Sequence, residues 1–295
     1  MKTNRINVIY KANCAKGLRN ETRFPKESVD LIITSPPYAD QRRSSYGGIR
    51  PEKYVEWFLP ISAQLYRILK PRGSFILNIK ENVKDGERQT YVLELIIAMK
   101  RQGWIWTEEY CWYKKNCHPG KWNNRFRDSW ERCLHFTKSK RFKMYQNSVK
   151  VPIGEWSKTR FKSMTKKDFI RTISGTNSKF GRKVSNWLNR RKVYPHNVLD
   201  FENEHYIEPT TVVQFATACS NRNHSAAFPL ELPSWFIKLF TKKGGTVLDP
   251  FMGIGTTGMA AILLKRNYIG IEVSKEYMKE ARNKIKRLNN LCKKR

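Results

Sequence analysis

The sequence predicts an α/β protein built on a mainly parallel sheet. Three observations support this prediction. Strand-like and helix-like runs alternate through the first half of the chain, and a strand, a glycine-rich turn and a helix follow one another near the C-terminus. Too little chain remains after that unit to complete a sheet, so the N-terminal segment must supply the other strands.

The N-terminal half supplies two clear helices and several strands. Apolar residues recur at helical spacing over 51–69 and 90–101, and Pro51 suits a first helical turn. We expect Lys70-Pro71-Arg72-Gly73 to end the first helix. Strands are predicted at 6–10, 29–33, 74–79, 104–112 and 131–137. We expect the first two of these strands to be neighbours in the sheet.

The C-terminal unit begins with a strand at 246–249 that closes on Asp249. Three glycines follow in a G-x-G-x-x-G pattern, Gly253, Gly255 and Gly258, and a helix continues over 259–264. A second strand then ends at Glu272, where a carboxylate can bind ribose hydroxyls. The glycine pattern alone would also suit a dinucleotide site. Only one more helix, 275–288, fits after it, so position argues against that alternative.

Composition indicates a polyanionic partner. The 295 residues include 57 Lys and Arg against 25 Asp and Glu, a net charge of +32, with 9 Trp, 13 Tyr and 15 Phe interleaved. Nucleic acid fits this balance. A membrane does not, because the most apolar stretch, 92–99, contains Glu94. No signal peptide is recognisable, so we expect a cytoplasmic protein.

Cysteine spacing predicts no metal site. The six cysteines include no pair at the two-residue spacing of zinc sites, although Cys111, Cys117, His118, Cys133 and His135 cluster loosely in sequence. In a cytoplasmic protein these thiols should be reduced. We interpret His135 as a structural histidine.

A basic region separates the two halves. Residues 114–200 contain 23 Lys and Arg against 5 Asp and Glu, with tryptophans scattered among them. A solvent-exposed charged face is the ordinary explanation, but arginines mixed with aromatic residues also suit a segment that recognises bases in a nucleic-acid groove. We predict three parts: a first core half at 1–113, a basic recognition region at 114–205 that overlaps a core strand near 131–137, and a second core half at 206–295. Within the recognition region, the candidate DNA contacts are Lys121, Arg125 and Arg127.

The turn Thr34-Ser35-Pro36-Pro37-Tyr38 directly follows an apolar strand. Its two prolines fix two φ angles and remove two backbone donors, which leaves a rigid loop. Ser35 and the Pro36 carbonyl offer acceptors, and Tyr38 offers a flat face. This set suits the exocyclic amine of a base, whose lone pair two acceptors help to localise. A plain proline turn is the alternative. The polar stretch after Tyr38 carries Arg42 and Arg43, which suit a phosphate clamp rather than a plain connector.

These motifs resemble those of a known family, the DNA amino-methyltransferases. Ser35-Pro36-Pro37-Tyr38 is similar to their catalytic motif, which commonly begins with Ser in the cytosine branch and with Asp or Asn in the adenine branch. Asp249-Pro250-Phe251-x-Gly253-x-Gly255-Thr256 resembles their S-adenosylmethionine loop. The order of the motifs is that of the β group, and residues 35–46 look like the cytosine enzymes of the PvuII kind. The segment 224–233 resembles a further family motif, with Ser225 in place of the usual Pro.

The resemblance implies a fold and a set of site residues. The fold would be a Rossmann-like S-adenosylmethionine-dependent methyltransferase sheet in permuted order, with the catalytic half N-terminal, the cofactor half C-terminal and a basic target-recognition region inserted. The catalytic residues would be Ser35, Pro36, Pro37 and Tyr38. The cofactor-binding residues would be Asn13, Phe228, Asp249, Phe251, Gly253, Gly255, Thr256 and Glu272.

The implied activity is methylation of the N4 amine of cytosine in duplex DNA, at a specific site, as the modification part of a restriction system. A cognate restriction endonuclease is then a candidate partner. Adenine N6 methylation is the nearer alternative, and RNA methylation and a non-catalytic binding protein also stay open. Enzymes that methylate carbon 5 of cytosine use a Pro-Cys nucleophile, and no proline here precedes a cysteine. The recognition sequence and the oligomeric state do not follow from the sequence.

Overall fold

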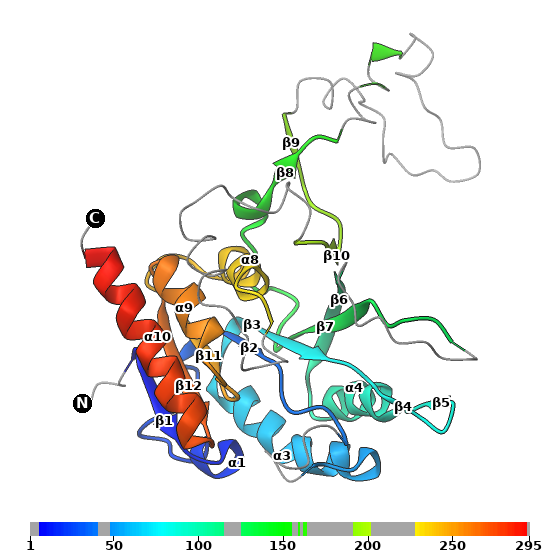
Figure 1. Ribbon diagram of the computed structural model, residues 1–295, viewed down its shortest axis with the longest axis vertical. Helices are drawn as coiled ribbons and strands as arrows, with labels where there is room; N and C mark the ends of the chain where they lie inside the picture. The colour runs from blue at the N-terminus through cyan, green and yellow to red at the C-terminus, as the bar shows by residue number, and fades with distance from the viewer. Residues whose placement is uncertain are drawn as a thin grey trace. The chain divides into compact units, whose positions relative to one another are not determined.

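The computed structural model in Figure 1 describes residues 6–40, 48–114, 125–154, 159, 162–163, 191–201 and 228–293. The chain divides into two compact units. One consists of Met1–Tyr145 with Asn197–Arg295, and the other of Gln146–His196. The first unit carries the large sheet and every residue predicted for catalysis or cofactor binding.

The described part of the first unit is organised around an eight-stranded sheet in the order β1-β12-β11-β2-β3-β7-β6-β10. All neighbouring strands are parallel except the pairs that involve β7, which runs antiparallel to β3 and to β6. The strands span Val8–Lys11 (β1), Val29–Thr34 (β2), Leu69–Ile79 (β3), Ile105–Tyr113 (β6), Trp130–Thr137 (β7), Val198–Leu199 (β10), Thr246–Asp249 (β11) and Asn267–Glu272 (β12). A mainly parallel α/β sheet is therefore confirmed.

Helices cover both faces of this sheet. They span Cys14–Gly17 (α1), Pro51–Ile68 (α3), Tyr91–Arg101 (α4), Glu231–Phe240 (α8), Thr256–Leu263 (α9) and Lys275–Lys293 (α10). Alternate strand residues point to opposite faces. Ile32 and Phe75 belong to a core cluster with Tyr54 of α3 and Leu95 of α4. On the other face, the Phe240 ring of α8 lies 4.5 Å from the ring of His135 on β7.

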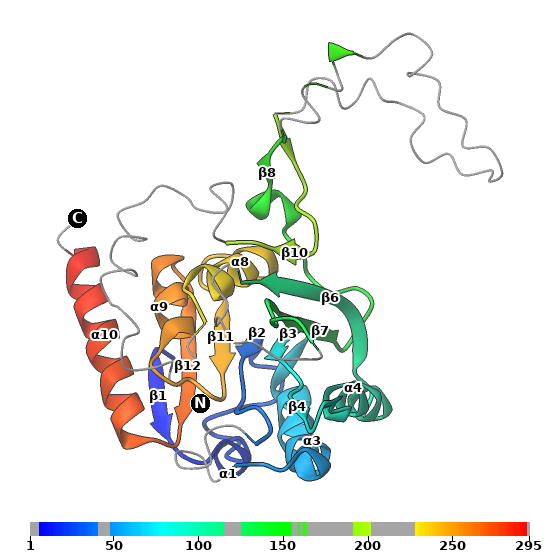
Figure 2. The ribbon, with the colours of Figure 1, turned by 45° about the vertical axis from the view of Figure 1, so that its right-hand side comes forward.

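The position of β1 differs from the sequence prediction. We expected β1 and β2 to be neighbours, but β12 and β11 lie between them, and β1 pairs with β12 instead (Figure 2). Strand periodicity shows which residues are buried and not which strands pair. Two strands near the C-terminus thus stand between β1 and β2 in a sheet whose other strands come from earlier in the chain.

The predicted helices and strands are otherwise found within a few residues of their expected positions. The first long helix ends at Ile68, and β3 begins at Leu69 rather than at Ser74, so Lys70 to Gly73 already belong to the strand. His135 is buried, and burial lowers its pKa to about 3. Its Nε2 lies 3.0 Å from the Ser74 hydroxyl, consistent with a structural role.

Two further two-stranded sheets lie outside the large sheet. In the first unit, β4 (Val83–Lys84) pairs with β5 (Glu87–Arg88) beyond the end of β3. In the second unit, β8 (Val151–Pro152) pairs with β9 (Lys192–Val193) after the short helix η1 (Gln146–Val149). The Lys150 ammonium lies 4.8 Å from the centre of the Tyr194 ring within this unit.

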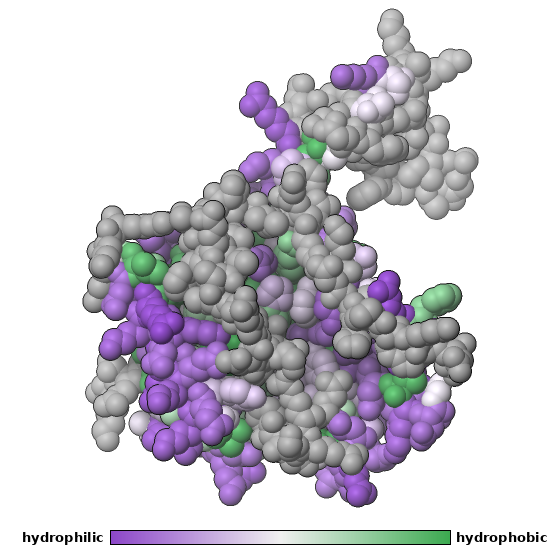
Figure 3. All heavy atoms as spheres, in the orientation of Figure 1, coloured by the Kyte–Doolittle hydropathy of each residue, from purple (hydrophilic) through white to green (hydrophobic). Residues whose placement is uncertain are grey.

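Hydrophilic side chains dominate the described surface in Figure 3, notably along α10. None of the helices in the described ranges combines the length and the apolar composition needed to span a bilayer.

Candidate active site

The candidate site lies where β2 and β11 end. These strands are parallel neighbours, so the turn after β2 and the glycine loop after β11 leave the sheet at the same edge (Figure 2). In parallel α/β sheets, ligands bind outside the carboxyl ends of the strands. Two motifs more than 200 residues apart in sequence are thereby brought together.

Asp249 joins the two loops. Its Oδ1 accepts from the Thr34 hydroxyl at 2.6 Å and from the Phe251 amide at 3.0 Å, and its Oδ2 accepts from the Thr257 hydroxyl at 2.6 Å. Thr34 directly precedes Ser35, while Phe251 and Thr257 stand on either side of Gly253 and Gly255. Burial raises the pKa of Asp249 to about 6, although these three donors favour the charged form.

The raised pKa of Asp249 predicts a measurable pH effect on stability. Because the folded state holds this proton more tightly than the unfolded chain, the contribution is fully present below pH 4 and is lost as pH rises through about 6. The Asp249→Asn variant has no ionisable group at this position and so lacks this pH dependence. The unfolding free energy of the wild type, relative to the variant, should fall by up to about 3 kcal/mol between pH 4 and pH 7. Denaturant titrations of both proteins measure it, and a constant difference would contradict it.

The glycine loop has the backbone shape that its glycines allow. Gly253 has φ +53° and Gly255 has φ +90°, values that other residues rarely adopt. A Cβ on Gly255 would also come within 2.9 Å of the Ala281 Cβ on α10. Among the described residues, the nearest atom to a Cβ on Gly253 would be the Phe251 carbonyl oxygen at 4.0 Å, so these residues leave space beside it.

Glu272 ends β12 next to this loop. The carboxylate accepts from the Gly253 amide at 2.7 Å and from the Ser274 amide at 2.8 Å. Glu272 is buried, and this burial raises its pKa although backbone amides favour the charged form. About four lone-pair sites exist on a carboxylate, so each oxygen can accept a further hydroxyl.

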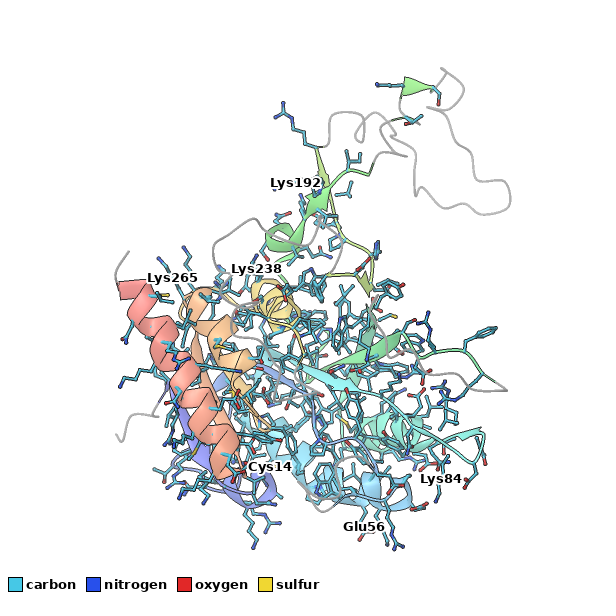
Figure 4. The ribbon with its side chains drawn as sticks, in the orientation of Figure 1. Cys14, Glu56, Lys84, Lys192, Lys238 and Lys265 are labelled. Atoms are coloured by element: carbon cyan, nitrogen blue, oxygen red, sulfur yellow. The ribbon has the colours of Figure 1, made fainter. Side chains whose placement is uncertain are left out.

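Asn13 lies at the end of β1, the strand that pairs with β12. Its Oδ1 caps α1 by accepting from the amides of Ala15 and Lys16, at 3.0 and 3.4 Å. The next residue, Cys14, labelled in Figure 4, is buried, and burial raises the pKa of its thiol to about 12. Asn13 therefore has a structural task, and among the described residues its side-chain NH2 has no acceptor.

The proline turn is held by its own neighbours. The buried Tyr54 of α3 donates its hydroxyl hydrogen to the Pro37 carbonyl at 3.0 Å. Among the described residues, none donates a hydrogen bond to the Pro36 carbonyl. Ser35 is half-buried and donates to the Tyr38 hydroxyl at 3.3 Å. The turn thus keeps one backbone acceptor and the serine lone pairs available.

Tyr38 is anchored from two strands. Its hydroxyl donates to Glu131 Oε2 at 2.7 Å and lies 3.2 Å from Asn78 Oδ1. Lys114 forms an ion pair with the other oxygen of Glu131. Burial beside Glu131 raises the pKa of Tyr38 well above its ordinary value, so the phenol stays protonated. Its ring is half-buried.

The other predicted cofactor residues lie around the glycine loop. Phe251 is half-buried, with its ring centre 5.8 Å from that of Trp57 on α3. Thr256 is the first residue of α9 and is buried, but it is the hydroxyl of Thr257 that binds Asp249. Phe228 is buried shortly before α8, and the preceding motif residues lie outside the described ranges.

The predicted DNA contacts are only partly described. Arg42, Arg43 and Lys121 lie outside the described residues. Arg125 donates to Asp128 at 3.2 Å, and Arg127 is exposed. Phe126, between these two arginines, is 96% exposed and was not predicted from the sequence. An aromatic ring with this exposure can stack on bases or pack against a sugar.

Glu131 and Asn78 were also missed as site residues. Each reads in the sequence as an ordinary polar residue in a strand. Because β7 is antiparallel, its start, with Glu131, lies beside the carboxyl end of β3, where Asn78 stands. The antiparallel pairing is the signal that would have found them.

Comparison with known proteins decides the family. A family model described as DNA methylase, of the N6/N4 methyltransferases, matches residues 29–283. The chain belongs to this DNA methylase family. The match includes the proline turn, the glycine loop and Glu272.

Individual relatives support the assignment. The DNA methylase is 28% identical to the type II methyltransferase M.PvuII of Proteus hauseri over 267 residues, covering 86% of this chain and 77% of the relative. It is 26% identical to the DNA adenine methyltransferase YhdJ of Escherichia coli K12, covering 87% and 76%. Its relatives therefore include an adenine enzyme.

Solved structures share the fold. The PvuII cytosine-N4-specific DNA methyltransferase matches with a TM-score of 0.67 and 23% identity, over 98% of this chain and 92% of that one. TTHA0409 of Thermus thermophilus, solved in complex with S-adenosyl-L-methionine, matches with a TM-score of 0.57 and 19% identity, over 95% and 93%.

Proposed function

We propose that this DNA methylase transfers a methyl group from S-adenosylmethionine to the N4 amine of cytosine in duplex DNA. The observation that carries the proposal is the position of Ser35. A short neutral hydroxyl stands at the end of β2, and the bond between Thr34 and Asp249 joins its turn to the glycine loop. The acceptors for an amine and the glycine loop of the nucleotide-binding type thus lie at the same edge of the sheet.

The residues at this edge fit S-adenosylmethionine. The described residues leave space beside Gly253, and the buried carboxylate of Glu272 borders the same loop. Glu272 would bind the ribose hydroxyls, and the loop from Gly253 to Thr256 would approach the cofactor closely. Asn13, Phe228 and Phe251 would complete the site. When bound, the cofactor supplies a methyl group activated on a sulfonium.

The catalytic turn would position the amine. Ser35 and the Pro36 carbonyl would accept its two hydrogens, while Tyr38 stacks on the base and Pro37 keeps the turn rigid. A paired base is out of reach, so the cytosine must be flipped out of the helix. Most of the rate enhancement would then come from holding the amine in line with the methyl carbon.

The identity of the methylated base can be tested by analysing the reaction product. Serine favours cytosine because its side chain is shorter than that of the Asp or Asn usual in adenine enzymes, so its acceptor oxygen lies at a different place. Methylated duplex should therefore yield N4-methylcytosine when it is digested to nucleosides and analysed by mass spectrometry against standards. Methyladenosine as the sole product would overturn the cytosine assignment and keep the enzyme class. Absence of transfer to any duplex would favour a binding protein.

DNA affinity should fall steeply with salt. Residues 114–200 carry 23 Lys and Arg, and Arg42 and Arg43 follow the catalytic turn. If Lys121, Arg125 and Arg127 are among some 6–10 phosphate contacts, affinity should drop by roughly 10³–10⁵ between 50 and 200 mM salt. Fluorescence anisotropy of a labelled duplex measures this drop. A flat salt series would contradict the proposed interface.

We further propose that the enzyme is the modification part of a restriction system and acts in the cytoplasm. Support comes from the relatives named type II methyltransferases, M.PvuII among them. A relative named the orphan methyltransferase M.BamHII, 27% identical over 88% of this chain, represents the alternative without a nuclease. Methylation-sensitive sequencing of DNA from cells that express the enzyme would give the recognition site and the nuclease to look for.

A further inference from the structure

The hydroxyl of Tyr38 makes contacts that stacking does not require. A phenylalanine ring would stack on a base equally well, because stacking uses only the face of the ring. Yet the hydroxyl donates to Glu131 Oε2 at 2.7 Å and also lies 3.2 Å from Asn78 Oδ1. Glu131 and Asn78 are both buried, so these are not incidental surface contacts.

Glu131 sets the direction of this hydrogen-bond chain. Its Oε2 receives hydrogens from Tyr38 and from Asn78 Nδ2, at 2.7 and 3.2 Å, and its other oxygen pairs with Lys114. An ionised carboxylate only accepts, so the single hydroxyl hydrogen of Tyr38 is directed to Glu131. The oxygen of Tyr38 can then only accept from Ser35.

The direction of the chain determines what Ser35 offers to a substrate. Ser35 donates its hydrogen to Tyr38 at 3.3 Å, longer than the roughly 2.8 Å usual between hydroxyls, so this link orients Ser35 without holding it tightly. With its hydrogen directed inwards, the lone pairs of Ser35 remain for an amine hydrogen. If the hydrogen-bond chain were reversed, the hydroxyl hydrogen of Ser35 would face an amine hydrogen of the base, and no hydrogen bond could form between them.

We propose that Glu131 acts through Tyr38 as a positioning residue for methyl transfer, keeping Ser35 an acceptor and receiving the proton that the amine loses. This inference rests on the proposed function. The amine nitrogen forms a bond to the methyl carbon while the carbon–sulfur bond breaks, its electron pair staying on sulfur, and the nitrogen becomes positive. Its proton then passes to Ser35, the Ser35 proton to Tyr38, and the Tyr38 proton to the Glu131 carboxylate.

The neighbouring carboxylates are engaged elsewhere. Asp249 accepts from Thr34, Thr257 and the Phe251 amide, and Glu272 accepts from the backbone beside the glycine loop. Within the described ranges, Glu131 is the carboxylate bonded to the hydroxyl chain of Ser35 and Tyr38. It is therefore the terminal acceptor that the geometry provides.

Two variants break the chain in different places. Tyr38→Phe removes the hydroxyl and keeps the ring. Glu131→Gln keeps the side-chain shape. Because Lys114 can only donate, the amide oxygen of the glutamine should face Lys114 and its NH2 should face Tyr38. The direction of the hydrogen bonds from Ser35 through Tyr38 is then reversed. Each should lower the single-turnover rate roughly 10–100-fold, below the full range for a general base because the Ser35 link is long. KM for DNA and the affinity for S-adenosylmethionine should stay unchanged.

The double variant provides the decisive comparison. Residues that act in one chain are not additive, so Tyr38→Phe with Glu131→Gln should be no slower than the slower single variant. Glu109→Gln is the matched control, because Glu109 lies on the neighbouring strand β6 and pairs with Arg132, the residue next to Glu131 on β7, and its described partners do not include Tyr38. It should keep wild-type activity.

A second readout does not depend on activity. The protein is labelled with ¹³C at the ζ carbon of its tyrosines and studied by NMR. The resonance of Tyr38 is assigned as the one that is missing from the spectrum of Tyr38→Phe. It should shift in Glu131→Gln and stay in place in Glu109→Gln, because the Tyr38 hydroxyl donates to Glu131, whereas Glu109 pairs with Arg132. An unshifted resonance in Glu131→Gln would overturn the contact itself.

The kinetic outcomes separate this inference from the proposed function. An active wild type with a fully active Tyr38→Phe would overturn the inference alone and leave Tyr38 a stacking residue. Multiplied losses in the double variant would assign Glu131 a separate structural role. A wild-type protein that transfers no methyl group to any duplex would overturn the proposed function, and the inference with it.

Discussion

Ser35→Ala is expected to lower the turnover of methyl transfer by roughly 10²–10³-fold, the loss typical of one preorganised polar partner in a reacting site. The variant removes the side-chain acceptor for the amine and leaves the Pro36 carbonyl. The turn itself should persist, because Tyr54 still holds the Pro37 carbonyl and the prolines still fix the backbone. Single-turnover assays with isotopically labelled S-adenosylmethionine measure the rate.

The control for this variant lies near the opposite end of the same strand. Ser28 precedes β2 and donates its hydroxyl hydrogen to the Pro25 carbonyl at 2.7 Å, so Ser28→Ala also removes one hydroxyl and one hydrogen bond. It should keep wild-type turnover. DNA affinity should be nearly unchanged in both variants. A Ser35→Ala protein that turns over at the wild-type rate would remove Ser35 from the catalytic turn.

Glu272→Ala is expected to weaken S-adenosylmethionine binding by roughly 10²-fold or more, because hydrogen bonds to a charged group are each worth about 1.5–3 kcal/mol and two ribose hydroxyls are available. DNA binding should change much less. Isothermal calorimetry gives the cofactor dissociation constant, and a separate anisotropy titration gives the DNA constant.

Glu272 also stabilises the loop that it borders, so a second variant is needed. Alanine leaves the partly buried amides of Gly253 and Ser274 without this acceptor, whereas Glu272→Gln keeps one acceptor oxygen and the side-chain volume. Glu276→Ala is the control, since this exposed carboxylate lies in the first turn of α10. If cofactor affinity is unchanged in a folded Glu272 variant, the ribose assignment is wrong.

Local patterns in the sequence predicted most of the elements and the two loops of the site. The helix at Pro51–Ile68 follows from apolar spacing and a proline in its first turn, both local properties. The ends of β2 and β11 are marked by prolines and glycines, which act through their own backbone angles. These signals do not depend on the rest of the chain.

Features that depend on pairing were not predictable in the same way. Nothing in the apolar run at Val8–Lys11 shows that it pairs with β12 rather than β2. Glu131 reaches Tyr38 only because β7 runs antiparallel to β3 and its first residues therefore lie beside the carboxyl end of β3. Asn13 was expected near the cofactor, and its capping of α1 depends on the turn that follows β1. The cofactor and DNA roles of individual residues stay predictions.

The place of β11 and β12 between β1 and β2 has a consequence for synthesis on the ribosome. Until Thr246–Glu272 has emerged, β1 has no partner along the edge that later meets β12, and β2 has none along the edge that later meets β11. Unpaired strand edges invite pairing with other chains, and contacts this distant in sequence form slowly. The nascent chain must therefore carry two open strand edges through most of its synthesis, and these edges are exposed to pairing with other chains until Thr246–Glu272 has been made.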